Sequence, residues 1–233
     1  MIDAYDAEGV IEEGELEYMN NSVVGVSQSG LEKLGWNRGE GDVLLINPTK
    51  GKVIQVAVVK PDGSPIYDQF LHAEPIGAIT VPVNSRGEIG IVTAWRWTAD
   101  PDLYDYETIE DNLDIIGRES VEVPRGFPMK GEAAAQTAAR EGGEELGSPV
   151  TSVTPIGVVT ANTAFNPHQI PVYLAVVDET FEGDIPGDVN ESILKVTWVS
   201  PAEIFAKIQG KEVYCGLTLS AIMLAFAHGA VSL

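Results

Sequence analysis

Three glutamates near the middle of the chain have the spacing of neighbours on a helix. Glu141, Glu144 and Glu145 stand in the i, i+3, i+4 relation and share one face if residues 132–146 are helical. Like charges at this spacing destabilise a helix by about 0.2–0.5 kcal/mol per pair. Mg²⁺ favours such a face, because it takes a few carboxylate oxygens and completes its shell with water and phosphate oxygens. The spacing indicates a divalent-metal site, although a glutamate-rich helix by itself is more often a solvated face.

The residues around these carboxylates predict the helix that positions them. Alanine dominates residues 133–139 and is the strongest helix former. Gly147, with Pro149 two residues later, provides a typical helix end. We therefore expect the helix to run over residues 132–146.

A longer pattern extends beyond the helix and has seven defined positions: Gly126, Glu132, Arg140, Glu141, Glu144, Glu145 and Gly147. These positions match G-x5-E-x7-R-E-U-x-E-E-x-G-U, where U is a bulky aliphatic residue, and on this ground the chain resembles the Nudix hydrolases. The resemblance implies a loop–helix–loop segment within an α/β/α sandwich, and hydrolysis of a diphosphate linkage. Gly142 and Ser148 depart from the pattern at two U positions. We expect this departure to weaken the packing of the helix on the sheet.

The resemblance also implies a role for each residue of the pattern. The implied metal-binding residues, the first of them through its carbonyl oxygen, are Gly126, Glu132, Glu141, Glu144 and Glu145. Arg140 would orient the carboxylates through a salt bridge. The cofactor would be Mg²⁺, or Mn²⁺ in its place, because a diphosphate carries two negative charges that an acidic protein repels.

Residues outside the pattern resemble one branch of the family, the ADP-ribose pyrophosphatases. Glu122-Val-Pro-Arg-Gly126 is similar to the Glu-x-Pro-x-Gly segment of that branch, and Val92-Thr-Ala-Trp-Arg96 occupies the place of its Gln-Tyr-Arg. The implied substrate-binding residues are Arg96, Arg125 and Glu122. Guanidinium groups pair bidentately with phosphoryl oxygens, which suits the two arginines to this role.

A general base is also required, and the residues leave two alternatives open. In the branch that the chain resembles, a glutamate in the loop before the last strand serves, and its counterparts here are Glu191 and Asp188. The alternative is a glutamate of the pattern itself, Glu144. We therefore expect the catalytic residues to be Glu144, Glu191 and Arg140.

Three functions are compatible with these residues. The first is Mg²⁺-dependent hydrolysis of ADP-ribose, or of a related nucleoside diphosphate sugar, to a nucleoside monophosphate and a sugar phosphate. The second keeps this chemistry with a nucleoside triphosphate or a dinucleoside polyphosphate as the substrate. The third is a nucleotide-sensing or interaction domain that has lost activity, but all four glutamates of the pattern are intact and argue against it.

The remaining chain predicts an α+β fold with a mixed sheet between helices. Residues 1–70 are expected to form an acidic arm and a small β subdomain that mediates dimerisation, and residues 71–233 the Nudix domain. A hairpin is expected at 78–83 and 88–94, and an acidic connection at 100–119. The other predicted strands are 43–46, 52–59, 66–70, 153–159, 171–177 and 193–199. The other predicted helices are 201–209 and 217–227.

Composition limits the partners and the compartment. The 233 residues include 35 Asp and Glu against 14 Lys and Arg, a net charge of −21. Such a surface repels phosphate backbones and anionic lipids, so we expect no nucleic-acid or membrane partner. The resemblance implies a nucleoside diphosphate-linked small-molecule substrate and a homodimer. Cys215 is the only cysteine, the acidic N-terminus is unlike a signal peptide, and the longest apolar run, 221–227, is too short to span a bilayer. The expected location is cytoplasmic.

Overall fold

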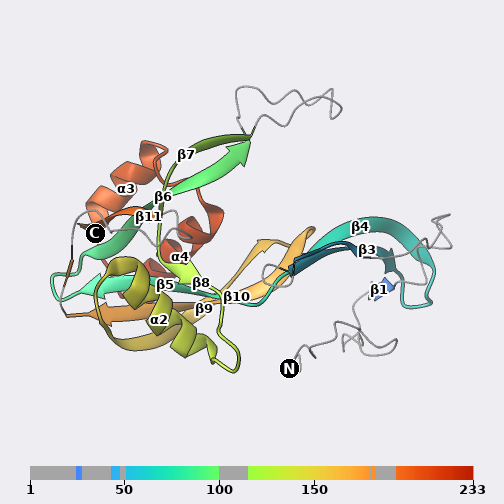
Figure 1. Cartoon of the computed structure of the whole chain (residues 1–233), viewed down its shortest axis with the longest axis horizontal. Coiled ribbons are helices and arrows are strands. Elements are labelled where there is room, and N and C mark those ends of the chain that lie inside the picture. Colours follow the sequence, from blue (N-terminus) through green and yellow to red (C-terminus); the bar gives the residue numbers. More distant parts are fainter. Residues whose placement is uncertain are drawn as a thin grey trace. The chain divides into compact units, whose positions relative to one another are not determined.

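The chain forms two compact units (Figure 1). The computed structural model describes residues 25–27, 43–47, 51–99, 115–178, 180–181 and 193–232. Unit 1 comprises the described residues up to Glu74 together with Ala164–Asn166, and unit 2 comprises Pro75–Thr163 and the described residues from Pro167 onward. The dimerisation expected of the N-terminal part stays a prediction.

Unit 1 contains a four-stranded sheet built around one central strand. Its strands are β1 (Gly25–Ser27), β2 (Val43–Asn47), β3 (Gly51–Val59) and β4 (Pro65–Ala73). β3 pairs antiparallel with each of the other three, and its pairing with β4 runs from Lys52 opposite Ala73 to Val59 opposite Pro65. The turn between β3 and β4 is closed by Asp62, whose carboxylate accepts hydrogen bonds from the Ser64 backbone N–H and hydroxyl.

Unit 2 contains a seven-stranded mixed sheet. Its strands are β5 (Ala78–Asn84), β6 (Ile89–Ala99), β7 (Ile115–Glu122), β8 (Arg125–Gly126), β9 (Val150–Asn162), β10 (Asn166–Val177) and β11 (Ile193–Val199). The order is β11-β6-β5-β10-β9, with β7 beside β6 and β8 beside β5. β5 runs parallel to β10 and antiparallel to β6 and β8. The expected α+β class with a mixed sheet is confirmed.

Three helices pack on this sheet: α2 (Ala134–Leu146), α3 (Pro201–Gln209) and α4 (Gly216–Ala227). α3 starts at a reciprocal cap, in which Ser200 Oγ accepts from the Glu203 N–H and the Glu203 carboxylate accepts from the Ser200 N–H. α2 ends at Gly147, which has the left-handed φ of 59° that favours glycine. These local signals explain why the helix ends agree closely with those predicted from the sequence.

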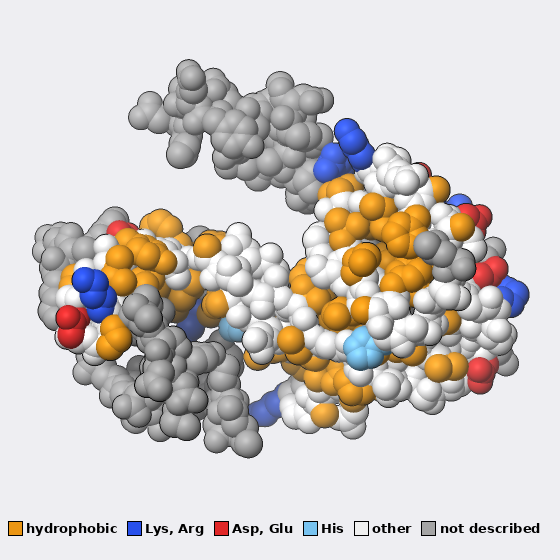
Figure 2. All heavy atoms as spheres, turned by 180° about the vertical axis from the view of Figure 1, so that it is seen from behind, with side chains coloured by type: hydrophobic (Ala, Val, Ile, Leu, Met, Phe, Trp, Pro, Cys, Tyr) orange, Lys and Arg blue, Asp and Glu red, His pale blue; other side chains and the backbone are white. Residues whose placement is uncertain are grey.

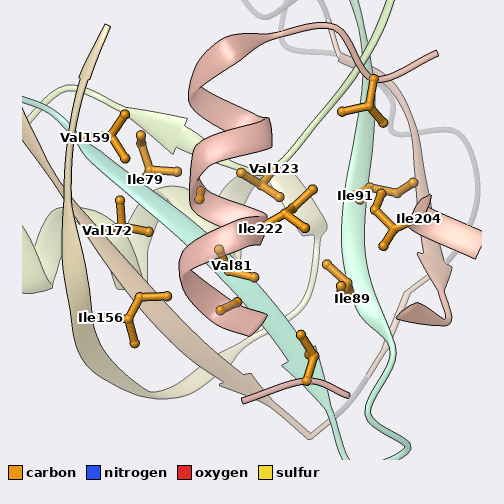
Figure 3. Packing of buried hydrophobic residues seen from close by; sticks show 14 of the residues in the cluster. Ile79, Val81, Ile89, Ile91, Val123, Ile156, Val159, Val172, Ile204 and Ile222 are labelled. Atoms are coloured by element: carbon orange, nitrogen blue, oxygen red, sulfur yellow. The ribbon is translucent and has the colours of Figure 1, made fainter. Parts of the chain in front are cut away.

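Alternate residues of β5 face opposite layers. Ile79 and Val81 are buried beside Ile222 of α4 (Figure 3), while Thr80 between them donates a hydrogen bond from its hydroxyl to the Ala138 carbonyl of α2. A second apolar cluster on the α2 side contains Leu146 and residues of β6, β10 and β11. The sheet is thus covered by α2 on one face and by α4 on the other, which confirms the expected α/β/α sandwich.

The structure differs from the sequence prediction at two strands. β5 and β6 form the expected tight turn, but they share only the pair Val83–Ile89 before β6 pairs with β7 and β11. β7 occupies part of the segment predicted as a connection over residues 100–119. Its strand pattern is hidden in the sequence because Arg118 and Glu122 stand where a half-buried strand usually places apolar residues.

The surface of unit 2 is largely apolar on one side. Figure 2 shows hydrophobic side chains gathered over the larger of the two units, with acidic and basic side chains mainly at its outer edge. Val158 of β9 and Met223 of α4 are exposed and line a shallow hollow together with Leu219 and Leu224. Within the described parts of the chain, no helix is long and apolar enough to cross a membrane.

The two glycines in α2 have different surroundings. A Cβ atom on Gly142 would lie 3.0 Å from Thr80 Cγ2 and 3.3 Å from Val150 Cγ2, so the missing side chain lets α2 approach β5 closely. Ser148 is buried, and its hydroxyl accepts a hydrogen bond from the Phe181 N–H. The expectation of weakened packing at these positions stays a prediction, and in the structure a close backbone approach and a buried hydrogen bond stand where the pattern has aliphatic side chains.

This packing predicts opposite effects for neighbouring substitutions. Gly142→Ile should lower the free energy of unfolding by about 1–3 kcal/mol, because the new side chain overpacks the contact with β5. Gly143→Ala, whose Cβ would lie 3.6 Å from the Ser148 carbonyl oxygen, should raise it by up to about 1 kcal/mol through helix propensity. Urea unfolding of both variants measures the difference, and a Gly142→Ile protein more stable than the parent would contradict the close approach.

Candidate active site

The guanidinium group of Arg140 holds three carboxylates. Its Nε lies 2.9 Å from Glu132 Oε1, its Nη1 2.9 Å from Glu144 Oε2 and its Nη2 2.8 Å from Glu141 Oε1. Nη2 also donates to the Phe127 carbonyl oxygen at 2.9 Å. The hydrogen bond with Glu132, followed by those with the other two glutamates, raises the pKa of Arg140 even though burial acts to lower it. The Arg140 cation thus ties the loop before α2 to the acidic face of the helix.

Glu132 is fixed from several directions. Its carboxylate accepts from the Met129 backbone N–H at 2.8 Å and from the Thr137 hydroxyl at 3.1 Å, in addition to Arg140. The Arg140 hydrogen bond, with the Met129 N–H next, lowers the pKa of Glu132 from 4.5 to about 2. Glu132 therefore stays ionised at neutral pH and serves as an anchor for the loop.

Glu141 lies against the backbone of β8. Any Cβ atom on Gly126 would overlap the Glu141 carboxylate, so only glycine allows this approach. The Gly126 carbonyl oxygen lies beside Gly77, just before β5, where a Cβ would also overlap it. Glu141 and Glu145 are each only 7% exposed, whereas the side chain of Glu144 is 51% exposed. Two of the helix carboxylates are therefore withdrawn from bulk solvent.

The donor set fits a divalent cation in its chemistry. Among the described residues, no three His, Cys, Asp or Glu side chains converge as a preassembled metal-binding group. Mg²⁺ does not require one, because proteins commonly hold it through one or two carboxylates while the substrate phosphates and water supply the other oxygens. The near-buried carboxylates of Glu141 and Glu145, four residues apart on one helix face, meet this requirement.

A second ionic cluster surrounds Glu122 at the end of β7. Arg96 Nη2 lies 2.9 Å from Glu122 Oε2, Arg96 Nε lies 3.2 Å from both carboxylate oxygens, and Arg125 Nη2 lies 3.0 Å from Oε2. Glu122 is 2% exposed, and burial acts to raise its pKa. The hydrogen bonds from Arg96 and the charge of Arg125 outweigh burial and lower the pKa of Glu122.

The two clusters are neighbours at β8. Arg125, which pairs with Glu122, directly precedes Gly126, and the Glu141 carboxylate lies against Gly126. Burial acts to lower the pKa of Arg96, but its hydrogen bond with Glu122 and the negative charges of Glu122 and Glu145 raise it. The structure thus brings together all the site residues expected from the sequence except Glu191, which, like Asp188, lies outside the described residues.

Several contributors were not found from the sequence. The Phe127 carbonyl and the Thr137 hydroxyl complete the contacts of Arg140 and Glu132. Thr137 lies one turn before Glu141 on the buried face of α2, so helical spacing could have indicated it. Thr218 of α4 accepts from the Val123 N–H at 3.3 Å and fixes the link between β7 and β8. No local signal reveals this contact, because the two residues are 95 positions apart.

Comparison with known families agrees with this arrangement. The sequence matches the NUDIX domain over residues 75–215, a range that contains both ionic clusters. The chain belongs to the Nudix family. A solved structure described as "Crystal structure of ADP compounds hydrolase" is similar to this Nudix protein, with a TM-score of 0.52 and 15% identity, over 81% of this chain and 96% of that chain. At this identity the likeness concerns the fold. The search of curated proteins finds no match.

The contacts of Glu132 predict a specific pH dependence. Because its pKa is lowered from 4.5 to about 2, its ionised form stabilises the folded protein above pH 4.5, and this contribution is lost as pH falls from there through 2. NMR titration of the Glu132 side-chain carboxyl should give a midpoint of about 2, and Arg140→Met should move it toward 4.5. A midpoint near 4.5 in the unmodified Nudix protein would show that the ion pair does not form in solution.

Proposed function

We propose that this Nudix protein is a Mg²⁺-dependent pyrophosphatase that hydrolyses ADP-ribose, or a related nucleoside diphosphate sugar, to a nucleoside monophosphate and a sugar phosphate. The observation that carries the proposal is the proximity of the two clusters, because Arg125 pairs with Glu122 and directly precedes Gly126, against which the Glu141 carboxylate lies. A diphosphate needs cationic partners on its oxygens and oxygen ligands for the accompanying metal. This site offers both within one short stretch of sheet and helix.

Each residue of the site then has a distinct role. Glu141 and Glu145 would hold the Mg²⁺ ion, with Glu144, Glu132 and the Gly126 carbonyl as the further oxygen donors. When bound, Mg²⁺ supplies neutralisation of the phosphate charge and a lower pKa for the attacking water. Arg140 is a positioning residue, because its guanidinium group holds three carboxylates. Arg96 and Arg125, oriented by Glu122, would bind phosphoryl oxygens.

The proposed reaction is hydrolysis of one phosphoanhydride bond. The oxygen of a water molecule bonds to one phosphorus, the bond from that phosphorus to the bridging oxygen breaks, and the second phosphate leaves with that oxygen. A carboxylate takes the proton of the water. Glu144 is one candidate, since its side chain is half exposed while Arg140 Nη1 holds one of its oxygens at 2.9 Å. Glu191 is the other candidate.

The biological setting belongs to the same proposal. A homodimer formed through unit 1 is supported by the branch that the sequence resembles. A cytoplasmic location is supported by the use of a single cysteine. Nucleoside triphosphates and dinucleoside polyphosphates are the substrates to compare with ADP-ribose, because the two clusters recognise only the phosphate groups.

Loss of one helix carboxylate should abolish activity without unfolding the protein. Glu145→Gln should lower kcat for ADP-ribose by about 100-fold or more, because the amide is a weaker ligand than the carboxylate for Mg²⁺. Release of AMP and ribose 5-phosphate, resolved by chromatography, measures the rate. Glu212→Gln, an exposed acid paired with Lys207, is the matched control and should keep full activity. If Glu145→Gln turned over ADP-ribose as fast as the parent, the assigned metal role of Glu145 would be wrong. If the parent hydrolysed none of the candidate substrates, the hypothesis of an inactive nucleotide-sensing or interaction domain would be favoured.

The identity of the base is tested by the pH dependence of kcat. If Glu191 accepts the proton, Glu191→Gln should remove the acidic limb of the profile and lower kcat by about 10²–10⁴-fold, while Glu144→Gln keeps that limb. The reverse pattern assigns the base to Glu144. An acidic limb that persists in both variants would exclude both carboxylates from this role.

A further inference from the structure

Arg118 lies directly opposite Arg96 in the pairing of β7 with β6. In an antiparallel pair, directly opposite residues place their Cβ atoms about 4.5–5.5 Å apart on the same face. Side chains alternate along β7, so Arg118 also shares its face with Glu122, four residues further along the strand. Arg118 therefore belongs to the face that carries the Arg96–Glu122–Arg125 cluster.

The flat face of the Arg118 guanidinium has a partner, but one of its edges does not. Its central carbon lies 3.9 Å from the centre of the Tyr214 ring, a cation–π stack. Among the described residues, its buried Nε has no hydrogen-bond partner and no acidic side chain forms an ion pair with Arg118. A buried N–H without an acceptor costs about 1–3 kcal/mol, so an acceptor oxygen supplied by a ligand would be favoured here.

The charge around this position favours an anionic ligand. Arg96 and Arg125 both contact Glu122, so a single carboxylate serves these two cations. Arg118 adds a third positive charge on the same face. The chain has only 14 Lys and Arg and a net charge of −21, so the gathering of these three arginines on one part of the sheet makes a local concentration of positive charge.

Tyr214 connects this position to the segment before α4. The Tyr214 hydroxyl donates to the Glu119 carbonyl oxygen at 3.3 Å, which holds the ring against β7. The segment before α4 therefore packs on β7 and orients the Arg118 guanidinium.

We propose that Arg118, oriented by the Tyr214 ring, is a substrate-binding residue that donates from its guanidinium edge to a phosphoryl oxygen held between it and Arg96. The inference rests on the proposed function and adds to it a residue that no pattern in the sequence indicated. Packing on Tyr214 alone does not explain the arrangement, because the stack engages the face of the guanidinium and leaves the Nε–H without an acceptor. A phosphoryl oxygen supplies that acceptor.

The test measures binding of α,β-methylene-ADP, whose P–C–P bridge resists hydrolysis, by calorimetry with Mg²⁺ present. Arg118→Met keeps an apolar stem against Tyr214 and removes the cation, and it should weaken binding about 10-fold or more. Arg118→Lys should bind with intermediate affinity, because a lysine keeps the charge without the planar fork. Arg86→Met, at the β5–β6 turn where Arg86 pairs with Glu88, is the control and should bind as the parent does.

A second pair of variants tests the role of the ring. Tyr214→Phe keeps the cation–π stack and should bind within about twofold of the parent, whereas Tyr214→Leu should weaken binding about threefold or more. With ADP-ribose as substrate, Arg118→Met should raise KM about 10-fold and change kcat by less than about threefold. A merely structural role would instead lower the thermal midpoint and leave the affinity of the folded protein unchanged.

The outcomes separate this proposal from the proposed function. Binding of the probe by Arg118→Met as tight as by the parent, or no binding by the parent, overturns the role of Arg118. If the parent binds the probe and Arg118→Met binds it more weakly, the anion-binding role of Arg118 is supported. If the parent also fails to hydrolyse ADP-ribose, ADP-ribose is excluded as the substrate while that role stands.

Discussion

The site depends on one cation among carboxylates that would otherwise repel one another. Arg140 contacts Glu132 from the preceding loop and both Glu141 and Glu144 from the helix. Without that positive charge, the loop and the helix would carry unbalanced negative charge at close range in a chain of net charge −21. With it, the loop is docked on α2 and the oxygen atoms are held in fixed directions before any ligand arrives. Arg140 therefore stabilises the fold locally and preorganises the site through the same contacts.

Close backbone approach is the second constraint, and glycine provides it at both faces of α2. Gly126 admits the Glu141 carboxylate against β8, and Gly142 admits Thr80 of β5 against the helix. A side chain at Gly142 would press α2 against Thr80 of β5, and a side chain at Gly126 would displace the Glu141 carboxylate from β8. At Gly142, where the chain departs from the family pattern, the helix thus lies close to the strand without an aliphatic side chain.

The sequence was most informative where the determining interactions are local. The α3 boundaries follow from the Ser200 cap, and the end of α2 follows from Gly147, because caps depend on residues within one turn. β7 was missed, since Arg118, Ser120 and Glu122 alternate along it where a half-buried strand usually places apolar residues. For Arg140, Glu132, Arg96 and Glu122, the sequence indicated roles only through the resemblance to the family. Their geometry depends on strand pairing and loop closure between residues 8 and 26 positions apart, which no local pattern encodes.

An acidic protein that binds an anionic substrate must recognise it locally. The net charge of −21 repels a diphosphate at long range, but salt screens this repulsion over about 8–10 Å. Arg96 and Arg125 both contact the carboxylate of Glu122, and Arg118 lies opposite Arg96 on the neighbouring strand. Glu122 does not cancel the charge of this cluster, because one carboxylate fixes the direction of two arginines. In the proposed function, binding would draw on short, directed hydrogen bonds from preoriented guanidinium groups and on a divalent ion at the helix, rather than on attraction by the protein as a whole.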